Sequence, residues 1–322
     1  MGPSLLISVV VCTYNRSVLL PGVLQSLCEQ TLATARYQII VVDNNSVDNT
    51  RAVTEEFCRR YANVRYQFEP RQGLSHARNR GWQVAQGEYV AYIDDDCKAP
   101  PEWLAVAKDV IERVSPAAFG GPSFPIYEAA KPRWYKDSYI AHVPYTDARA
   151  LKGEECVKIY GHNMFFRRSL LENLGGFDPR LGMSGQNIAY GEETALLRLI
   201  AGTMPHELIY YEPRLYVYNL VRPDKMTFSW MARAAFASGR MCYHVFGATA
   251  GAGGRRQLAL KTIETLLAFA KSVLASTMRW NRRQYPYIQN YWYDHVFPHL
   301  QKLGMLYEVY RGMMQRPRFL SG

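Results

Sequence analysis

Three consecutive carboxylates, Asp94, Asp95 and Asp96, directly follow the apolar run EYVAYI. Adjacent carboxylates repel one another unless a cation or hydrogen-bond donors lie between them. Hard divalent ions such as Mg²⁺ and Mn²⁺ prefer carboxylate oxygens and leave coordination positions that phosphate oxygens can fill. An exposed acidic turn that caps the following helix is the structural alternative. Because the triplet ends a predicted buried strand, the sequence favours a cation site that a phosphate can reach.

Short β-branched runs alternate with helical patterns around this triplet. The predicted strands cover residues 7–12, 37–43, 64–69 and 88–94. The predicted helices lie between them, at residues 19–29, 50–61 and 74–85. Continuous apolar strands separated by helices indicate a parallel sheet that is covered on both faces. Polar clusters end three strands, at residues 13–16, 43–46 and 94–96, so we expect them to line one crevice at the carboxyl edge of the sheet.

The rest of the chain is organised differently. Residues 120–161 are rich in Pro, Gly and aromatic side chains and show no clean period, which predicts loops with short strands over the site. Helical patterns follow near residues 168–174, in GEETALLRLI, at 227–240 and at 255–280. The expected fold is therefore α/β, a mostly parallel sheet flanked by helices, with a helical C-terminal region. We place the domain boundary near residue 225, giving domains 1–225 and 226–322.

The segment LALKTIETLLAFAKSVLASTM, at residues 258–278, is the most apolar long stretch of the C-terminal region. Lys261, Glu264 and Lys271 interrupt it at positions where charges are costly inside a bilayer, so a membrane-spanning helix is not expected. An amphipathic helix fits better. The flanking arginines and aromatic residues leave two interpretations open, a helix packed in the core and a helix at a membrane surface.

Composition places the chain among ordinary globular proteins, with 48% hydrophobic and 20% charged residues. The formal net charge of +10 favours polyanionic partners such as nucleotides or anionic lipid headgroups, and the cations concentrate in residues 255–318. The six cysteines are scattered without a CxxC pair, which favours a reducing cytosol. The first residues lack the features of a signal peptide and are interpreted as leading into a buried strand.

Five motifs occur in a characteristic order: ISVVVCTYNR, VVDNNSVDNT, GLSHARNRG, YIDDDC, and GGFDPRLG with GEETALL. In this order they resemble family 2 glycosyltransferases of the GT-A fold, over about residues 5–240. The resemblance implies a Rossmann-like GT-A domain, a nucleotide-sugar donor as co-substrate and a divalent metal, Mn²⁺ or Mg²⁺. It does not identify the sugar.

The resemblance also implies a role for each cluster on the donor side. Thr13, Tyr14 and Arg16 would line the nucleotide pocket, Asp43 would hydrogen-bond the base, and Arg78 would approach the nucleotide.

The triplet and a later strand would hold the metal. Asp94 and Asp96 resemble a DXD motif, with Asp96 as direct metal ligand, while Asp94 and Asp95 would contact ribose or metal-bound water. Asn219 stands where family members often carry a metal-binding His, and an Asn carbonyl oxygen binds these ions more weakly than His binds Mn²⁺.

The acidic pair Glu192 and Glu193 opens a predicted helix, where the helix dipole stabilises carboxylates, so it is also simply a good helix start. The resemblance implies that the second acid is the general base for the acceptor hydroxyl. Family members usually have Asp there; Glu193 is the first candidate, with Glu192 assisting or competing.

The predicted function is an inverting transfer of a sugar, expected from a UDP-sugar, to a hydroxyl of a saccharide or lipid-linked acceptor in surface polysaccharide or glycan synthesis. Processive members carry QxxRW, whereas STMRW has Ser276 in place of Gln, which predicts a non-processive enzyme. A nucleotidyltransferase and a non-catalytic basic protein that binds membrane or nucleic acid are the alternatives. Nucleic acid is not an expected partner, because its recognition motifs are absent. We expect a cytoplasmic protein with peripheral contact at the inner face of the membrane.

Overall fold

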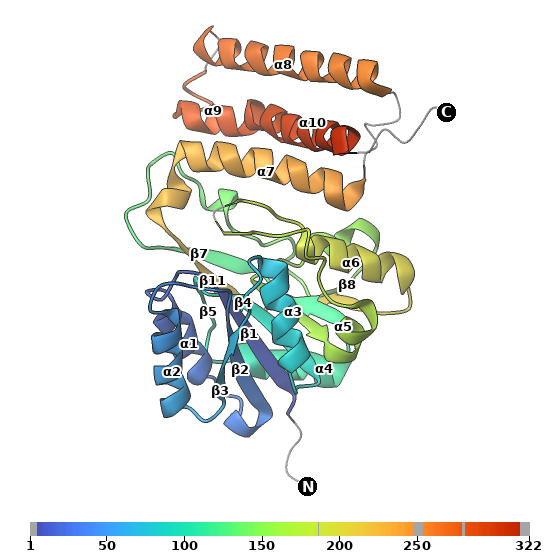
Figure 1. Ribbon diagram of the computed structural model, residues 1–322. Coiled ribbons are helices and arrows are strands. Elements are labelled where there is room, and N and C mark those ends of the chain that lie inside the picture. Colours follow the sequence, from blue (N-terminus) through green and yellow to red (C-terminus); the bar gives the residue numbers. More distant parts are fainter. Residues whose placement is uncertain (1–4, 186, 248–253, 279–280, 316–322) are drawn as a thin grey trace, which may run out of the picture. The chain divides into compact units, whose positions relative to one another are not determined.

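The computed structural model describes residues 5–185, 187–247, 254–278 and 281–315 (Figure 1). The chain divides into two compact units. The first consists of Met1–Glu128, Asp137–Gln186 and Glu192–Val221, and the second of Ala129–Lys136, Asn187–Gly191 and Arg222–Gly322. The motif STMRW ends at Arg279 and Trp280, which lie outside the described residues, as do the last cations of the basic stretch.

The first unit is built on an eight-stranded sheet of order β3-β2-β1-β4-β9-β6-β10-β8. The first four strands, which are mutually parallel, are β1 (Ile7–Thr13), β2 (Tyr37–Asp43), β3 (Val64–Phe68) and β4 (Tyr89–Asp94). The others are β6 (Ala118–Gly120), β8 (Arg149–Leu151), β9 (Asn163–Arg167) and β10 (Ile209–Tyr211). Strand β9 is antiparallel to both β4 and β6, and β8 is antiparallel to β10. The predicted mostly parallel α/β sheet is confirmed, and the antiparallel β9 is an addition that the sequence did not indicate.

Helices cover both faces of this sheet. One core contains α1 (Leu20–Cys28), α2 (Thr50–Arg60) and α4 (Trp103–Val114), and the other contains α3 (Leu74–Val84), α5 (Arg168–Leu174) and α6 (Glu192–Thr203). Along β1, Val9 and Val11 belong to the first core and Val10 to the second. Because both faces are buried, the strands are continuously apolar, which is why the sequence showed unbroken runs rather than alternation.

Short 3₁₀ helices complete the elements, at Thr34–Arg36, Asp137–Tyr139, Gly153–Lys158 and Pro223–Met226.

A smaller three-stranded sheet begins where the acidic triplet ends. Its order is β5 (Cys97–Lys98), β11 (Val217–Val221) and β7 (Ser123–Tyr127). Asn219 is registered opposite Cys97, and the Leu220 amide donates to the Asp96 carbonyl over 2.7 Å. Backbone pairing therefore places Asn219 next to Cys97, the residue that directly follows the triplet.

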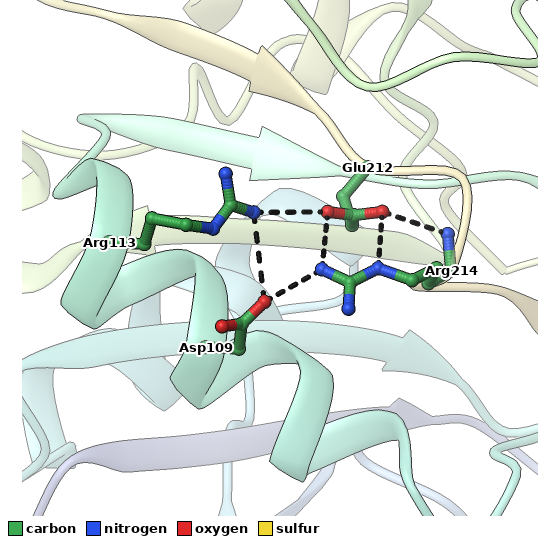
Figure 2. Close-up of polar contacts among 4 residues, drawn as sticks. All are labelled: Asp109, Arg113, Glu212 and Arg214. Atoms are coloured by element: carbon green, nitrogen blue, oxygen red, sulfur yellow. Dashed lines mark hydrogen bonds and ion pairs between the residues drawn. The ribbon is translucent and has the colours of Figure 1, made fainter.

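The turn before β11 is held by a group of charged residues (Figure 2). The Glu212 side chain, only 2% exposed, pairs with Arg113 of α4 at 3.4 Å and with Arg214 at 3.0 Å. Arg214 also reaches Asp109 of α4, at 2.7 Å. Burial opposes ionisation of Glu212, but the hydrogen bonds and charge of Arg214, with the charge of Arg113, outweigh it and lower the pKa of this carboxyl. The network ties α4 to the turn that leads into β11.

Replacing Glu212 with Gln should lower the free energy of unfolding by about 1–2 kcal/mol at pH 7. This loss is at the lower end of the range for hydrogen bonds to charged groups, because Arg113 and Arg214 are about half exposed and solvent screens their charges. Since the folded-state pKa is lowered, the stabilisation is complete above the ordinary Glu pKa and disappears as pH falls through the lowered value. Urea unfolding of both proteins between pH 7 and pH 3 should show the difference shrinking toward acid pH. Asp147→Asn, in an exposed ion pair with Arg149, serves as control and should change stability by less than about 0.5 kcal/mol. A difference that grows toward acid pH would contradict the assignment.

The second unit contains four α-helices among the described residues: α7 (Phe228–Phe246), α8 (Gly254–Met278), α9 (Ile288–His295) and α10 (Phe297–Gln315). Helices α7 and α10 pack with their backbones close together, because a Cβ on Gly239 would lie 1.8 Å from the Gln301 carbonyl oxygen, and one on Gly304 would lie 2.1 Å from that of Phe236. Arg240 pairs with the buried Glu308 at 2.5 Å across the same contact. Helix α10 lies between α7 and α8 within this unit (Figure 1). No helix in the described part of the chain combines the length and apolar character needed to cross a bilayer.

Candidate active site

The ends of β1 and β4 meet through direct contacts of their side chains. The Thr13 hydroxyl donates to one oxygen of Asp95 over 2.8 Å, and Arg16 Nη1 donates to the other over 2.7 Å. The same Arg16 nitrogen lies 3.5 Å from Asp96 Oδ2. Burial raises the pKa of Asp95 to about 6 against the attraction of Arg16, and the adjacent Asp96 adds to the rise. One arginine therefore supplies positive charge to two buried carboxylates.

The polar residues after β1 and β2 also join the two strand ends. The Asn15 amide donates to the Ser46 hydroxyl over 2.9 Å, and the Val47 amide donates to Asn15 Oδ1 over 2.8 Å. Asn15 and Asn45 both have positive φ, 51° and 65°, which asparagine tolerates better than most residues. These two asparagines therefore form the turns that follow β1 and β2.

A pocket of about 130 Å³ opens at the three strand ends, as the sequence predicted. Its lining includes five of the predicted residues: Thr13, Tyr14, Arg16, Asp94 and Asp95. Residues that the prediction missed complete it: Cys12, Asn44, Gln72, Leu74, Ala77, Met183 and Gly185. Asn44 belongs to a polar cluster that the sequence had indicated, whereas nothing in the sequence pointed to Met183 and Gly185, which reach the pocket from a distant loop.

Asp43 lies beside this pocket and not among its lining residues. It is 2% exposed, accepting from the Ser46 amide over 2.9 Å with one oxygen and from the Tyr66 hydroxyl over 2.9 Å with the other. In this arrangement its carboxylate orders the loop after β2. Contact with a nucleotide base stays a prediction.

Arg78 of α3 connects the acidic triplet with the acidic pair. Its guanidinium, 3% exposed, pairs with Glu192 at 2.5 Å and lies 3.8 Å from Asp94 Oδ1. It also donates to the Gly161 carbonyl over 3.1 Å. Burial opposes its charge, but Glu192 and Asp94 outweigh burial and raise the pKa of Arg78. It is thus a buried cation shared by two parts of the site rather than a residue that lines the pocket.

The two glutamates at the start of α6 are in different environments. Glu192 is 5% exposed and is engaged by Arg78, whereas Glu193 is partly exposed. Burial, followed by the charge of Glu192, raises the pKa of Glu193 to about 8, although Arg78 acts in the opposite direction. A carboxyl group whose pKa is raised to about 8 is suited to accept a proton near neutral pH, and Glu192 is already paired with Arg78, so these two features favour Glu193 over Glu192 for that role.

The residues predicted to bind a metal offer oxygen atoms as donors. Asn219 is 9% exposed, and its Oδ1 is buried without a hydrogen-bond partner among the described residues. Its strand is bonded to the Asp96 backbone, so an amide oxygen and the carboxylates of the triplet belong to one region. Such hard oxygen donors fit Mg²⁺ or Mn²⁺. Over the described ranges, no group of three or more His, Cys, Asp or Glu side chains is arranged to hold a metal ion.

Solved structures with the same architecture define the class of fold. The TarS fragment 1–349 of S. aureus in complex with UDP aligns with a TM-score of 0.55 and 17% identity, covering 96% of this chain and 92% of that one. The mannosyltransferase PcManGT of Pyrobaculum calidifontis, in complex with GDP-Man and Mn²⁺, aligns with a TM-score of 0.56 and 19% identity, covering 94% and 88%. At these identities the likeness establishes the fold, which is the predicted GT-A type.

The sequence comparisons then identify the family. The model of glycosyl transferase family 2 matches residues 8–175, and the chain belongs to this family. The glucosyl-dolichyl phosphate glucuronosyltransferase of Haloferax volcanii is 29% identical over 239 residues, 72% of this chain and 75% of the relative. The succinoglycan biosynthesis protein ExoM of Rhizobium meliloti is 28% identical over 242 residues, 73% of each chain. The predicted enzyme class, a glycosyltransferase, is confirmed.

Proposed function

We propose that the protein transfers a sugar from a nucleotide diphosphate donor, a UDP-sugar, to a hydroxyl of a saccharide or lipid-linked acceptor, non-processively and with inversion, in surface polysaccharide or glycan synthesis. The observation that carries the proposal is the pocket inside a family 2 domain where Thr13 and Arg16 meet Asp94 and Asp95. The names of two relatives support both acceptor types, one with a dolichyl phosphate lipid and one with a polysaccharide. A cytoplasmic location stays a prediction.

On the donor side, the pocket combines a cation with carboxylates at the strand ends. Arg16 lies at the pocket and carries a charge that its contacts with Asp95 and Asp96 maintain, so it can attract the diphosphate. Asp94, Asp96 and Asn219 would hold a divalent cation, which would neutralise the charge that develops on the leaving diphosphate. Tyr14, which lines the pocket and is partly exposed, offers a ring face to the nucleotide.

On the acceptor side, we assign Glu193 as the general base. Its raised pKa lets it hold a proton taken from the acceptor hydroxyl, while Glu192 is engaged by Arg78 in an ion pair. With a single base acting on the attacking hydroxyl, one direct displacement at the sugar carbon inverts its configuration. The donor diphosphate leaves from the opposite side.

Nucleotide diphosphate sugars should raise the melting temperature of the protein when Mn²⁺ is present. A donor at 100 times its Kd adds about 2.7 kcal/mol of stability, which corresponds to a shift of several degrees. UDP-sugars should produce larger shifts than GDP-sugars, and nucleoside monophosphates with Mn²⁺ serve as the control. Released product is then measured, because sugar transfer yields a nucleoside diphosphate whereas nucleotidyl transfer yields pyrophosphate. If no nucleotide sugar shifts the melting temperature, or if pyrophosphate appears, the proposal is wrong.

A further inference from the structure

Helix α8 of the second unit exposes an apolar face that its own packing does not use. Six large apolar side chains on it have exposed fractions between 49% and 75%: Leu260, Ile263, Leu266, Leu267, Leu274 and Met278. Their spacing of three, four and seven residues places them on one side of a helix. A contiguous apolar patch of this kind, kept in water, usually marks a surface that binds something.

The opposite face of α8 supplies the contacts that hold the helix in its unit. Leu258, 4% exposed, packs with Leu306 and Val309 of α10. Ser276, 1% exposed, accepts a hydrogen bond from the Trp292 indole of α9 over 3.1 Å. The fold of the unit therefore accounts for the inner face, and the apolar outer face requires another explanation.

The apolar surface continues onto α10 through a cavity between the two helices. This cavity of about 290 Å³ is lined almost entirely by apolar groups, among them Leu258, Ile263, Met313 and Met314. Tyr310 and Met314, which also line it, are 56% and 59% exposed. Ile263 belongs both to the cavity and to the exposed stripe, so the two form one surface.

Cations accompany this surface. Helix α8 carries four cations, Arg255, Arg256, Lys261 and Lys271, against a single carboxylate, Glu264, and Arg282 and Arg283 follow shortly after the helix. Among them, Arg256 and Lys271 are exposed and Lys261 is partly exposed. An apolar stripe with a basic margin is complementary to anionic lipid headgroups above acyl chains. Two copies of the same face would instead bring like charges together, which disfavours self-association.

We propose that the outer face of α8, with the α8–α10 cavity, docks on the surface of an anionic lipid bilayer. The helix lies in the plane of the interface, its leucines and Ile263 inserted among acyl chains and its lysines and arginines at the headgroups. This surface shares no residue with the proposed donor site. It specifies residues for the membrane contact that the sequence analysis expected only in general terms from the basic C-terminal helices.

The test measures co-sedimentation of the full chain with vesicles of phosphatidylcholine containing 30% phosphatidylglycerol, compared with phosphatidylcholine alone. The wild type should bind the anionic vesicles at least about tenfold more strongly, and 0.5 M salt should weaken the binding. The double variant Ile263→Ser with Leu267→Ser should lose at least about tenfold in vesicle affinity, because two exposed apolar anchors are removed. Both positions are more than half exposed, so the variant should fold like the wild type.

Leu199→Ser is the matched control, since Leu199 is an exposed leucine, 42%, on α6 of the other unit. It should bind vesicles like the wild type. Nucleoside diphosphate affinity, measured on the same proteins, should not change in the double variant, which separates a failure of this inference from a failure of the proposed function. The inference is overturned if the wild type does not bind anionic vesicles or if the double variant binds them equally well. It is also overturned if light scattering shows that the wild type is a dimer, the double variant is a monomer, and neither protein binds vesicles.

Discussion

Glu193→Gln is expected to reduce the turnover number for sugar transfer by about 10²- to 10⁴-fold, the contribution typical of a general base. Gln has the shape of Glu but cannot accept the proton of the acceptor hydroxyl. The wild type should show kcat/KM rising with pH through a midpoint near pH 8 and levelling off about one pH unit higher, because the carboxylate must be deprotonated and the pKa of Glu193 is raised to about 8. The variant should lack this rise. Donor affinity should remain the same in both proteins.

The neighbouring Glu192 provides a discriminating control. In Glu192→Gln the negative charge that helps to raise the pKa of Glu193 is removed while Arg78 remains, so the rise in kcat/KM should move to lower pH. The same variant should lose about 3 kcal/mol of stability, because the buried Arg78 loses its closest partner. If Glu193→Gln keeps the pH dependence and Glu192→Gln removes it, Glu192 is the base.

Asp96→Ala should weaken Mn²⁺-dependent binding of a nucleoside diphosphate by at least about 100-fold, since removing even an outer-sphere partner of a metal site typically costs about 10- to 100-fold. Titration calorimetry with Mn²⁺ and with EDTA separates the metal-dependent part. In EDTA the two proteins should bind with similar, weaker affinity, because Arg16 and the pocket walls are still present.

The fold should tolerate this change. Asp96 is 6% exposed beside the buried Asp95, so its removal relieves a repulsion between two carboxylates, and Arg16 keeps its 2.7 Å contact with Asp95. Asp147→Asn, an exposed aspartate of the same unit, should bind nucleotide like the wild type. If Asp96→Ala binds the nucleoside diphosphate with unchanged Mn²⁺-dependent affinity, the assignment of the triplet to the donor site is wrong.

Local patterns predicted the elements that burial makes recognisable along the chain. Strands β1 to β4 were recognised because burial on both faces makes them continuously apolar, and their polar ends indicated the pocket. Strand β9, by contrast, is a short run whose partner β4 lies about 70 residues earlier, and no period reveals such a pairing.

The same limit applies to the site. The types of Asp94, Asp96 and Glu193 led to the roles predicted for them, but the link between Arg78 and Glu192 joins residues 114 positions apart and could only come from tertiary structure. Likewise, the Tyr66 hydroxyl donates to the Asp43 carboxylate through a hydrogen bond that depends on β2 and β3 pairing in register.

The way in which β11 reaches the acidic triplet bears on how such a site can evolve. Asn219 is placed by the ladder that pairs it with Cys97 and bonds Leu220 to Asp96, and a backbone ladder does not depend on which side chain occupies position 219. At the proposed cation site, a single codon change at position 219 would therefore exchange one donor atom for another while the strand stays in register. The preference of the proposed site for one cation over another would then change separately from the fold.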